Sequence, residues 1–414
     1  MKHIQGLAIV LLALVLLWAG PAAAATSFQC PNNYVPRGNR TPFDAFDDAN
    51  GDGMLRADEG EISNALSPNQ VCMHLSGGDG FGRMADGYDQ YLFGFANLTG
   101  IPNNQIMAAG ALAAEWPAPT IELKEGDEFY LTLSNVGMQI RPDLFDPHTV
   151  HYHGLPHSTN IYDGLPESGI AINMGSSLTY FYYNAEPGTY IYHCHVEATE
   201  HMQMGMLGNL YVKPAQDGTS ITYQGRTFSR FAYNDGDGST GYDVAYPLQL
   251  GGFDKEFHDA SLNVAPLPFA AMWDDYPMIN GRGYPDTVST ADLPASSLNP
   301  TGKISQKVDS LVTAAPGQRI LLRISNLNVT RFHTLASTIP MTVVAKDAKL
   351  LRSASGDNLY YTTNSVTVGG GETYDVIIDT AGYAGTHFLY AANLNLLSNN
   401  EQAYGGMMTE IRIQ

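Results

Sequence analysis

Residues 125–135 read EGDEFYLTLSN, and residues 316–326 read PGQRILLRISN. Each stretch opens with a glycine turn and then places apolar residues at every second position, which is the period of a half-buried β-strand. A second pair of similar stretches follows in the same order, GTYIYHCH at 188–195 and GTHFLYAA at 385–392. The sequence therefore predicts two copies of one β unit, each a Greek-key sandwich or barrel.

The chain has 414 residues, which is enough for two such domains. Segment 216–300 is rich in Gly, Asp and Pro and links the two copies. We predict an all-β protein with two tandem Greek-key domains and an N-terminal extension. The predicted ranges are 26–79 for the extension, 80–215 for the first domain and 216–414 for the second.

The N-terminus has the features of an export signal. Lys2 and His3 precede the apolar run LAIVLLALVLLWAG, and the small residues PAAAAT follow it. This apolar run is short for a membrane span, so we expect residues 1–25 to be removed as a signal peptide near Ala25. The remaining chain is then expected in the periplasm or outside the cell, without a membrane span.

The chain is acidic, with 41 Asp and Glu against 21 Lys and Arg and a formal net charge of −20. An acidic surface repels phosphate backbones, so no nucleic-acid partner is expected. Such a surface suits cationic partners or metal ions, although solubility alone also explains it.

The chain contains three cysteines, Cys30, Cys72 and Cys194. In an oxidising compartment Cys30 and Cys72 could form a disulfide that ties down the N-terminal segment. Cys194 is then left over, and it lies between His193 and His195. A buried structural thiol would not need two flanking imidazoles, so Cys194 is a candidate metal ligand.

The histidines around Cys194 have the spacing of metal ligands on strands. Residues two apart point to the same side of a strand, so His193 and His195 share one side and Cys194 points to the other. His151 and His153 form a second pair of this kind. A thiolate with imidazoles and a weak thioether is the ligand set of a blue-copper electron-transfer centre, and a cluster of imidazoles suits copper that meets oxygen. Zinc accepts similar ligands, but the methionine-rich sequence MQMGM at 202–206 favours copper.

The second copy lacks these residues. Tyr390, Ala391 and Ala392 occupy the places of the His-Cys-His triplet, and His333 is the one histidine near the place of the earlier histidine motif. We therefore predict that the first domain binds metal and that the second domain serves as a scaffold without copper ligands.

Two motifs together resemble those of multicopper oxidases, the family that includes laccases and is built from cupredoxin domains. They are HTVHYHG at 148–154 and HCHVEATEHMQMGM at 193–206, and the resemblance extends from about residue 80 to the end of the chain. It implies a type 1 copper in the first domain, with Met206 rather than Met204 as the axial ligand, and leaves His157 without a ligand position. The implied ligands are His148, Cys194, His201 and Met206 for type 1 copper, and His151, His153, His193 and His195 for type 2 and type 3 copper.

The same resemblance implies a reaction. A donor, which could be a phenol, a metal ion or a redox protein, loses one electron at a time at the type 1 site. Cys194 passes the electrons through the backbone to His193 and His195, and oxygen is reduced at the copper cluster there.

The sequence departs from the family in the second domain, which contains no His-x-His pair. One chain thus supplies half of a three-copper cluster, so an oligomer or another partner supplies the rest, or the site is reduced. We expect a homo-oligomer in which first domain faces first domain across a two-fold axis, and the alternative is a ring in which first domains meet second domains. Two alternatives remain open. One is an enzyme similar to copper nitrite reductases, and the other is a non-enzymatic carrier of electrons or copper that keeps only the type 1 site.

Residues 48–59, DANGDGMLRADE, match the EF-hand calcium loop. Gly53 allows the sharp turn at position six of such a loop. Short helices are expected around it, before it near Phe43 and Phe46 and after it near Ile62 and Leu66. We predict a structural Ca²⁺ site with the ligands Asp48, Asn50, Asp52, Met54 (through its carbonyl) and Glu59.

Overall fold

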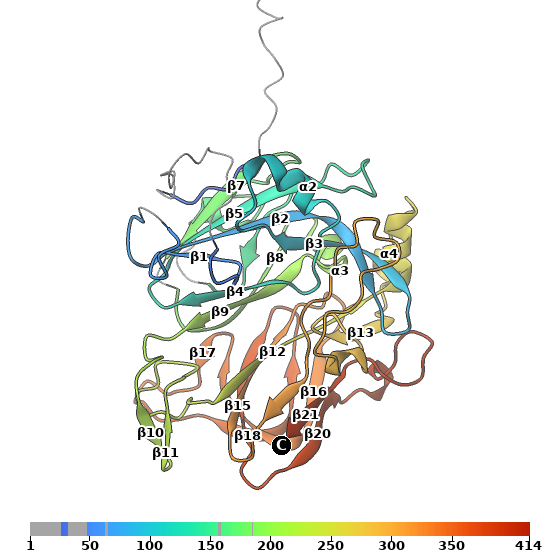
Figure 1. The fold of residues 1–414 in the computed structure, drawn as a ribbon. Helices are drawn as coiled ribbons and strands as arrows, with labels where there is room; N and C mark the ends of the chain where they lie inside the picture. Colours follow the sequence, from blue (N-terminus) through green and yellow to red (C-terminus); the bar gives the residue numbers. More distant parts are fainter. Residues whose placement is uncertain (1–25, 32–47, 63–64, 156–158, 184) are drawn as a thin grey trace, which may run out of the picture.

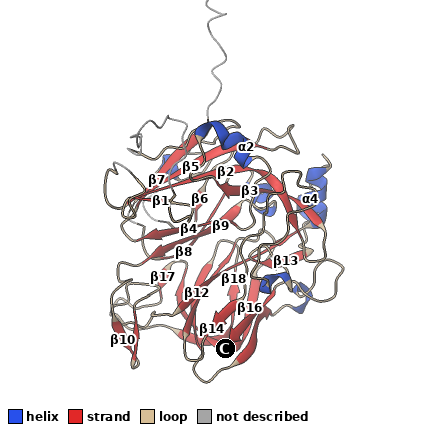
Figure 2. Cartoon of the chain, in the orientation of Figure 1, coloured by secondary structure: helices blue, strands red, loops and turns tan. Residues whose placement is uncertain are grey.

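The computed structural model describes residues 26–31, 48–62, 65–155, 159–183 and 185–414. The predicted signal peptide, Phe43, Phe46 and His157 lie outside these residues. The described chain forms two β domains stacked end to end, with few short helices, which confirms the all-β prediction (Figures 1 and 2). No helix in the described ranges has the length and apolar character needed to span a membrane.

The first domain is a sandwich of two sheets. One sheet has the order β1-β2-β5-β7 with β3 beside β2, and the other has the order β4-β9-β8-β6. Phe129, Leu131 and Leu133 are fully buried between the sheets, as their alternation predicts. The strands are β1 Leu55–Arg56, β2 Gln70–Arg83, β3 Asp89–Asn97, β4 Ala118–Lys124, β5 Glu128–Gly137, β6 His151–Tyr152, β7 Ser177–Tyr182, β8 Gly188–His193 and β9 Leu207–Lys213.

The second domain is built on one ten-stranded sheet with the order β13-β12-β15-β19-β16-β20-β21-β14, with β17 and β18 also beside β16. The long strand β16 pairs with β20 through one part and with β19 through another, so it joins the two sides of the core. The strands are β12 Val244–Phe253, β13 Tyr276–Ile279, β14 Val312–Ala314, β15 Arg319–Asn326, β16 His333–Lys346, β17 Lys349–Leu350, β18 Tyr361–Val368, β19 Thr373–Asp379, β20 Gly385–Ala391 and β21 Met408–Ile413.

Short elements connect and cover the sheets. The hairpin of β10 Ile221–Tyr223 and β11 Arg226–Phe228 follows the first domain. The helices are α2 Ile106–Gly110, α3 Ala198–Gln203 and α4 Lys255–Leu262, and the 3₁₀ helices are η1 Asn103–Gln105, η2 Asn160–Tyr162, η3 Phe269–Ala271, η4 Asp286–Val288 and η5 Leu394–Leu396.

The two domains repeat the same strand pairings. In the first, β2 is parallel to β5 and β5 is antiparallel to β7; in the second, β12 is parallel to β15 and β15 is antiparallel to β19. The pairs β4–β9 and β8–β9 correspond in the same way to β14–β21 and β20–β21. The internal duplication seen in the sequence is therefore a duplication of topology.

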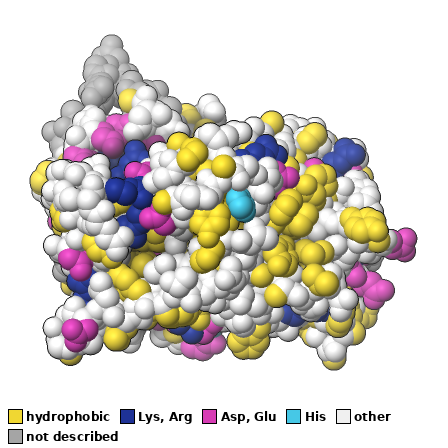
Figure 3. All heavy atoms as spheres, turned by 90° about the horizontal axis from the view of Figure 1, so that it is seen from below, with side chains coloured by type: hydrophobic (Ala, Val, Ile, Leu, Met, Phe, Trp, Pro, Cys, Tyr) yellow, Lys and Arg dark blue, Asp and Glu magenta, His cyan; other side chains and the backbone are white. Residues whose placement is uncertain are grey.

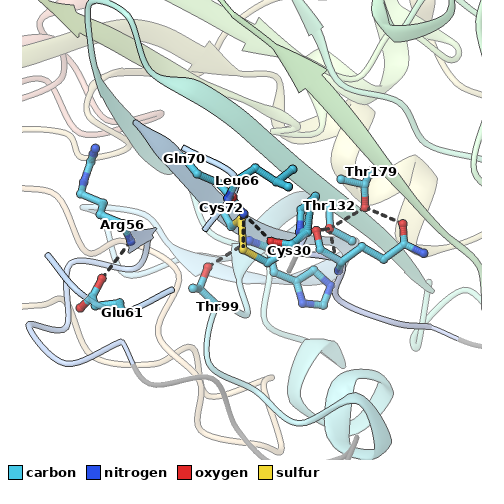
Figure 4. Close-up of a disulfide and its surroundings, with 12 residues drawn as sticks. Cys30, Arg56, Glu61, Leu66, Gln70, Cys72, Thr99, Thr132 and Thr179 are labelled. Carbon is cyan, nitrogen blue, oxygen red and sulfur yellow. Dashed lines mark hydrogen bonds between the residues drawn. A yellow bond between two sulfur atoms is a disulfide. The ribbon is translucent and has the colours of Figure 1, made fainter. Parts of the chain in front are cut away.

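The N-terminal extension is part of the first-domain sheet. β2 crosses the predicted boundary between the extension (26–79) and the first domain (80–215), and β1 pairs with β2. Cys30 and Cys72 form the predicted disulfide, which joins segment 26–31 to β2 (Figure 4). The backbone N–H of Gln29 also donates to Thr132 of β5 at 3.2 Å, so this segment lies along the sheet.

Figure 3 shows the end of the molecule formed by the second domain, seen from below. Apolar, acidic and basic side chains are interspersed on this face. The net negative charge of the chain is therefore not gathered into one acidic surface at this end.

Candidate metal centre

The first donor set lies where three segments of the first domain meet. His148 precedes β6 and is held by backbone hydrogen bonds in both directions with Ile172, at 3.0 and 2.9 Å. Cys194 follows β8, and His201 lies in α3. The Nδ1 atoms of His201 and His148 are 3.2 and 3.8 Å from the Cys194 sulfur, and all three side chains are fully buried.

Met206 is connected to this set through the backbone. The N–H of Met206 donates to the carbonyl of His201 at 2.8 Å, and the N–H of Cys194 donates to the carbonyl of Met206 at 3.1 Å. Met204 is equally buried, but its carbonyl accepts from Phe93 of β3. Backbone hydrogen bonds thus connect Met206 directly to both Cys194 and His201.

The electrostatics of this set favour an ionised sulfur. Burial opposes ionisation of Cys194, but the charge of His201 and hydrogen bonds with both imidazoles bring the pKa of the thiol well below its usual value. Burial alone would lower the pKa of His201, whereas Cys194 and Asp146 raise it to about 10. Two buried imidazoles beside an ionised thiolate, with the backbone of Met206 bonded to Cys194 and His201, fit copper.

The second donor set lies on the other side of the same strand. His151 of β6 and His193 of β8 face each other in the antiparallel register. The Nε2 atoms of His153 and His193 are 3.0 Å apart, and donor atoms of these two and His151 lie within 4.8 Å of one another. The ring of His195 is 5.1 Å from that of His151, so the structure brings all four predicted histidines together, three of them most closely.

Hydrogen bonds orient these rings. Nδ1 of His151 donates to the carbonyl of Asp163 at 2.6 Å, and Nδ1 of His193 donates to the carbonyl of Cys194 at 2.7 Å, which leaves Nε2 of each ring as the donor for a metal. Burial lowers the pKa of His193 to about 3, and burial and the neighbouring His151 lower the pKa of His153. Both imidazoles are therefore neutral at physiological pH, which is the state that binds metal.

A cavity of about 510 Å³ opens beside this histidine cluster. Its lining includes His153, His193 and His195 of the first domain and residues 327–332 with Gly370 of the second domain. Nδ1 of His153 also donates to the carbonyl of Gly371 at 3.4 Å. The second domain of the same chain therefore borders the cluster, but it places no histidine in the described lining of the cavity.

Three residues of this centre were not identified from the sequence. Asp146 lies 3.7 Å from Nε2 of His201, Asp163 holds His151, and the hydroxyl of Thr149 accepts from the backbone N–H of His195 at 3.0 Å. Thr149 also donates its own N–H to the Cys194 sulfur at 3.5 Å. Asp146 and Thr149 flank His148 in the sequence, and that proximity is the one signal that could have marked them.

The EF-hand-like loop has a folded backbone but no flanking helix in its described surroundings. Asp48 accepts from the N–H groups of Gly51 and Gly53, at 2.8 and 3.0 Å. Loop residues Leu55 and Arg56 form β1, and described residues 60–62 and 65–66 contain no helix where one was expected. The buried Arg56 lies 3.7 Å from Asp52, 4.0 Å from Glu59 and 3.2 Å from Asp127, so a fixed positive charge already stands beside two predicted calcium ligands.

Two cupredoxin-like domains with a Cys-His-His donor set behind a histidine cluster define a two-domain cupredoxin-type copper protein. Family models described as "Multicopper oxidase" match residues 98–217 and 265–411. The chain belongs to the multicopper oxidase family.

The individual relatives are distant. The chain is 26% identical to "Putative laccase-17" of Oryza sativa subsp. japonica over 287 residues, which cover 67% of this chain and 41% of that protein. It is 25% identical to "Copper resistance protein A" of Pseudomonas syringae pv. tomato, covering 70% of this chain and 45% of that protein. The chain thus spans less than half the length of these curated relatives.

Solved structures share the fold. A blue copper oxidase from Nitrosomonas europaea has a TM-score of 0.59 at 23% identity, covering 83% of this chain and 86% of that one. A copper nitrite reductase from Nitrosomonas europaea has a TM-score of 0.55 at 14% identity, covering 83% of this chain and 94% of that one. At these identities the likeness concerns the fold alone.

Proposed function

We propose that this protein is a copper-dependent oxidase that takes electrons one at a time from a donor and delivers them to oxygen. The observation that carries the proposal is the position of Cys194, whose side chain belongs to one donor set while its neighbours His193 and His195 belong to the other. Copper in both sets would supply one-electron redox chemistry. The residues that would hold it are His148, Cys194, His201 and Met206 in the first set and His151, His153, His193 and His195 in the second.

The chain itself provides three things for this function. Two peptide bonds join Cys194 to its neighbouring histidines, so a continuous covalent path connects the two donor sets. The cavity beside the histidine cluster gives a small molecule such as oxygen a place to enter. The first donor set is fully buried, which shields the sulfur from bulk water. The donor class remains a phenol, a metal ion or a redox protein.

Copper counting with an oxygen electrode tests this function. The copper-loaded protein is expected to hold more than one copper per chain and to consume oxygen with a phenol or Cu(I) as donor. His153→Ala should retain the visible band of the first donor set but stop oxygen uptake, because it removes a cluster ligand. One copper per chain with no oxygen uptake would instead support the electron or copper carrier. Nitrite consumption without oxygen uptake would support the enzyme similar to nitrite reductases.

The missing half of the cluster leads us to propose a homo-oligomer. The first domain provides four histidines, and residues 327–332 of the same chain cover one side of the cavity without adding a ligand. A second copy would therefore approach from the open side. We expect first domain to face first domain, because the alternative ring would bring a second domain without paired histidines to the cluster. Crosslinking with mass analysis distinguishes the two, and a monomer with full oxygen uptake would contradict both.

Export and calcium binding complete the proposal. The Cys30–Cys72 disulfide supports an oxidising location, in the periplasm or outside the cell.

For calcium, the proposed ligands are the side chains of Asp48, Asn50, Asp52 and Glu59 with the carbonyl of Met54. The positive charge of Arg56 beside two of these carboxylates leads us to expect weak binding, with a Kd of about 10⁻⁴–10⁻³ M, the range of extracellular modules.

A further inference from the structure

The second domain contains a buried histidine that no hydrogen bond explains. His333 begins β16 and has no exposed surface, and neither of its ring nitrogens has a hydrogen-bond partner among the described residues. Burial lowers its pKa to about 4, so the ring is neutral. A buried polar group without a partner costs stability, and its presence calls for a reason.

The strand register gives the first part of that reason. In the first domain β6 pairs with β8 through His151 and His193, and in the second domain β16 pairs with β20 through Ala336 and Tyr390. The next pairs, Tyr152 with Tyr192 and Ser337 with Leu389, also correspond. Counting back three residues along the first strand of each pair leads to His148 in one domain and His333 in the other. His333 therefore holds the place of a type 1 ligand.

Backbone hydrogen bonds identify the other three places. The N–H of Cys194 donates to the carbonyl of Met206 at 3.1 Å, and the N–H of Ala391 donates to the carbonyl of Met407 at 2.9 Å. The N–H of Met206 donates to the carbonyl of His201 at 2.8 Å, and the N–H of Met407 donates to the carbonyl of Leu396 at 2.9 Å. The four corresponding pairs are His148 and His333, Cys194 and Ala391, His201 and Leu396, and Met206 and Met407.

We propose that the second domain contains a disused type 1 copper site, in which His333 and Met407 remain and apolar residues replace the thiolate and one imidazole. Ala391, Leu396 and Met407 are all buried in the core of this domain. Apolar side chains at the two exchanged places fill the core without adding further unpartnered polar groups. The domain thus folds without metal, and the unpartnered ring of His333 is what remains of the ligand set.

Restoring the two exchanged residues tests the proposal directly. In a Cys194→Ser background, which removes the first-domain thiolate, Ala391→Cys and Leu396→His should bring back an intense visible thiolate-to-copper band and one additional copper per chain. Adding His333→Phe should remove that band again, because it deletes a retained ligand. A folded variant that carries both restored residues in the Cys194→Ser background but shows no such band would overturn the proposal.

A second variant keeps the proposal testable if the restored domain does not fold. In the otherwise unchanged protein, His333→Leu replaces a ring without partners by an apolar side chain. The melting temperature should stay equal or rise, and the visible band of the first domain and the copper content should not change. The matched control His148→Leu should lose the band. A lower melting temperature or lost copper in His333→Leu would show that the His333 ring stabilises the native protein or supports copper binding, and would overturn the proposal.

Discussion

At the scale of single residues, Cys194 decides the chemistry of the centre. Its sulfur lies near two imidazoles, and the peptide bonds on either side of it lead to two further imidazoles. We predict that Cys194→Ser abolishes the visible charge-transfer band of the copper-loaded protein, because a hydroxyl does not replace a thiolate in this role. Absorption spectroscopy on refolded and copper-loaded variants measures this. A band that persists in the Cys194→Ser variant would remove the assignment of the first donor set.

The buried His74 of β2 should make the stability of the folded protein depend on pH. Its Nε2 is 2.8 Å from the hydroxyl of Ser134, and its ring stacks on Phe28. Burial lowers its pKa from 6.5 to about 3. Because the folded state holds the neutral ring, its contribution to stability is complete above pH 6.5 and declines as the pH falls toward 3.

His74→Gln removes this titration and retains a polar group of similar length. Between pH 7 and pH 5 the wild-type protein should lose up to about 2 kcal/mol more unfolding free energy than the variant, which is about 1.5 pH units at about 1.36 kcal/mol each. Urea unfolding at the two pH values measures the difference. Equal losses in the two proteins would contradict the prediction.

Alternation along a strand predicts that Cys194 points away from His193 and His195, whereas His148, His201 and Met206 were implied as further ligands only by the resemblance to multicopper oxidases. Asp146 and Asp163 could not be predicted as their partners. Nδ1 of His151 lies 2.6 Å from the backbone carbonyl of Asp163 and 3.4 Å from its carboxylate, and Asp146 lies 3.7 Å from Nε2 of His201. No strand period relates the residues of either contact, so the sequence does not indicate them.

At the scale of elements, the duplicated strands were predictable and β2 was not. Its sequence, QVCMHLSGGDGFGR, contains four glycines that are typical of turns, yet it forms a strand of 14 residues. The glycines serve close packing instead. A Cβ on Gly77 would lie 2.8 Å from Cδ2 of His148, so the His148 ring packs directly against the strand backbone.

Gly77→Ala should therefore disturb the first donor set. The added methyl group displaces the ring of His148, and we expect a shifted or weakened visible band and at least about tenfold weaker copper retention against a chelator, equivalent to about 1.4 kcal/mol. Gly82→Ala in the same strand is the matched control, because its Cβ meets the flexible ends of Leu92, Met84 and Gln306. Identical spectra for the two variants would contradict the proposed packing role of Gly77.

A second prediction at this scale concerns calcium binding by the loop at 48–59. Glu59→Gln removes one carboxylate oxygen from the proposed calcium site, and binding should weaken by about tenfold or more. Asp58→Asn is the control, because Asp58 is not one of the proposed calcium ligands and its carboxylate pairs with Lys124 at 2.6 Å. Titration calorimetry measures both. A wild-type protein that binds no Ca²⁺ at millimolar concentration would end the calcium proposal.

At the scale of the whole molecule, a buried polar network joins the two domains at β8, the strand that leads to Cys194. The hydroxyl of Thr189 in β8 donates to Asp375 of β19 at 2.5 Å and accepts from Arg323 of β15 at 3.0 Å. Tyr233 donates to the same carboxylate at 2.6 Å. The repetition of one β unit was predicted from the duplicated sequence, but this interface was not, because its partners are far apart in the chain and share no sequence pattern.

Asp375→Ala should destabilise the protein by about 3–5 kcal/mol, because it leaves Arg323 buried without its carboxylate partner. Asp375→Asn retains the hydrogen-bonding shape and should cost less. Denaturant unfolding, followed by fluorescence and by the visible copper band, measures both effects. An alanine variant as stable as the wild type would show that this network does not hold the domains together.

The attachment of β8 to the second domain also bears on the speed of the proposed electron transfer. A redox centre responds quickly when its ligands move little as its charge changes, because surroundings that are already oriented need not rearrange at that moment. β8 is bonded to β9 and β6 along its edges and is held near its start by Thr189, so Cys194 and its neighbouring histidines continue from a strand fixed on several sides. The second domain, although it provides no histidine to the described lining of the cavity, would in this way keep the reorganisation energy of the first domain low.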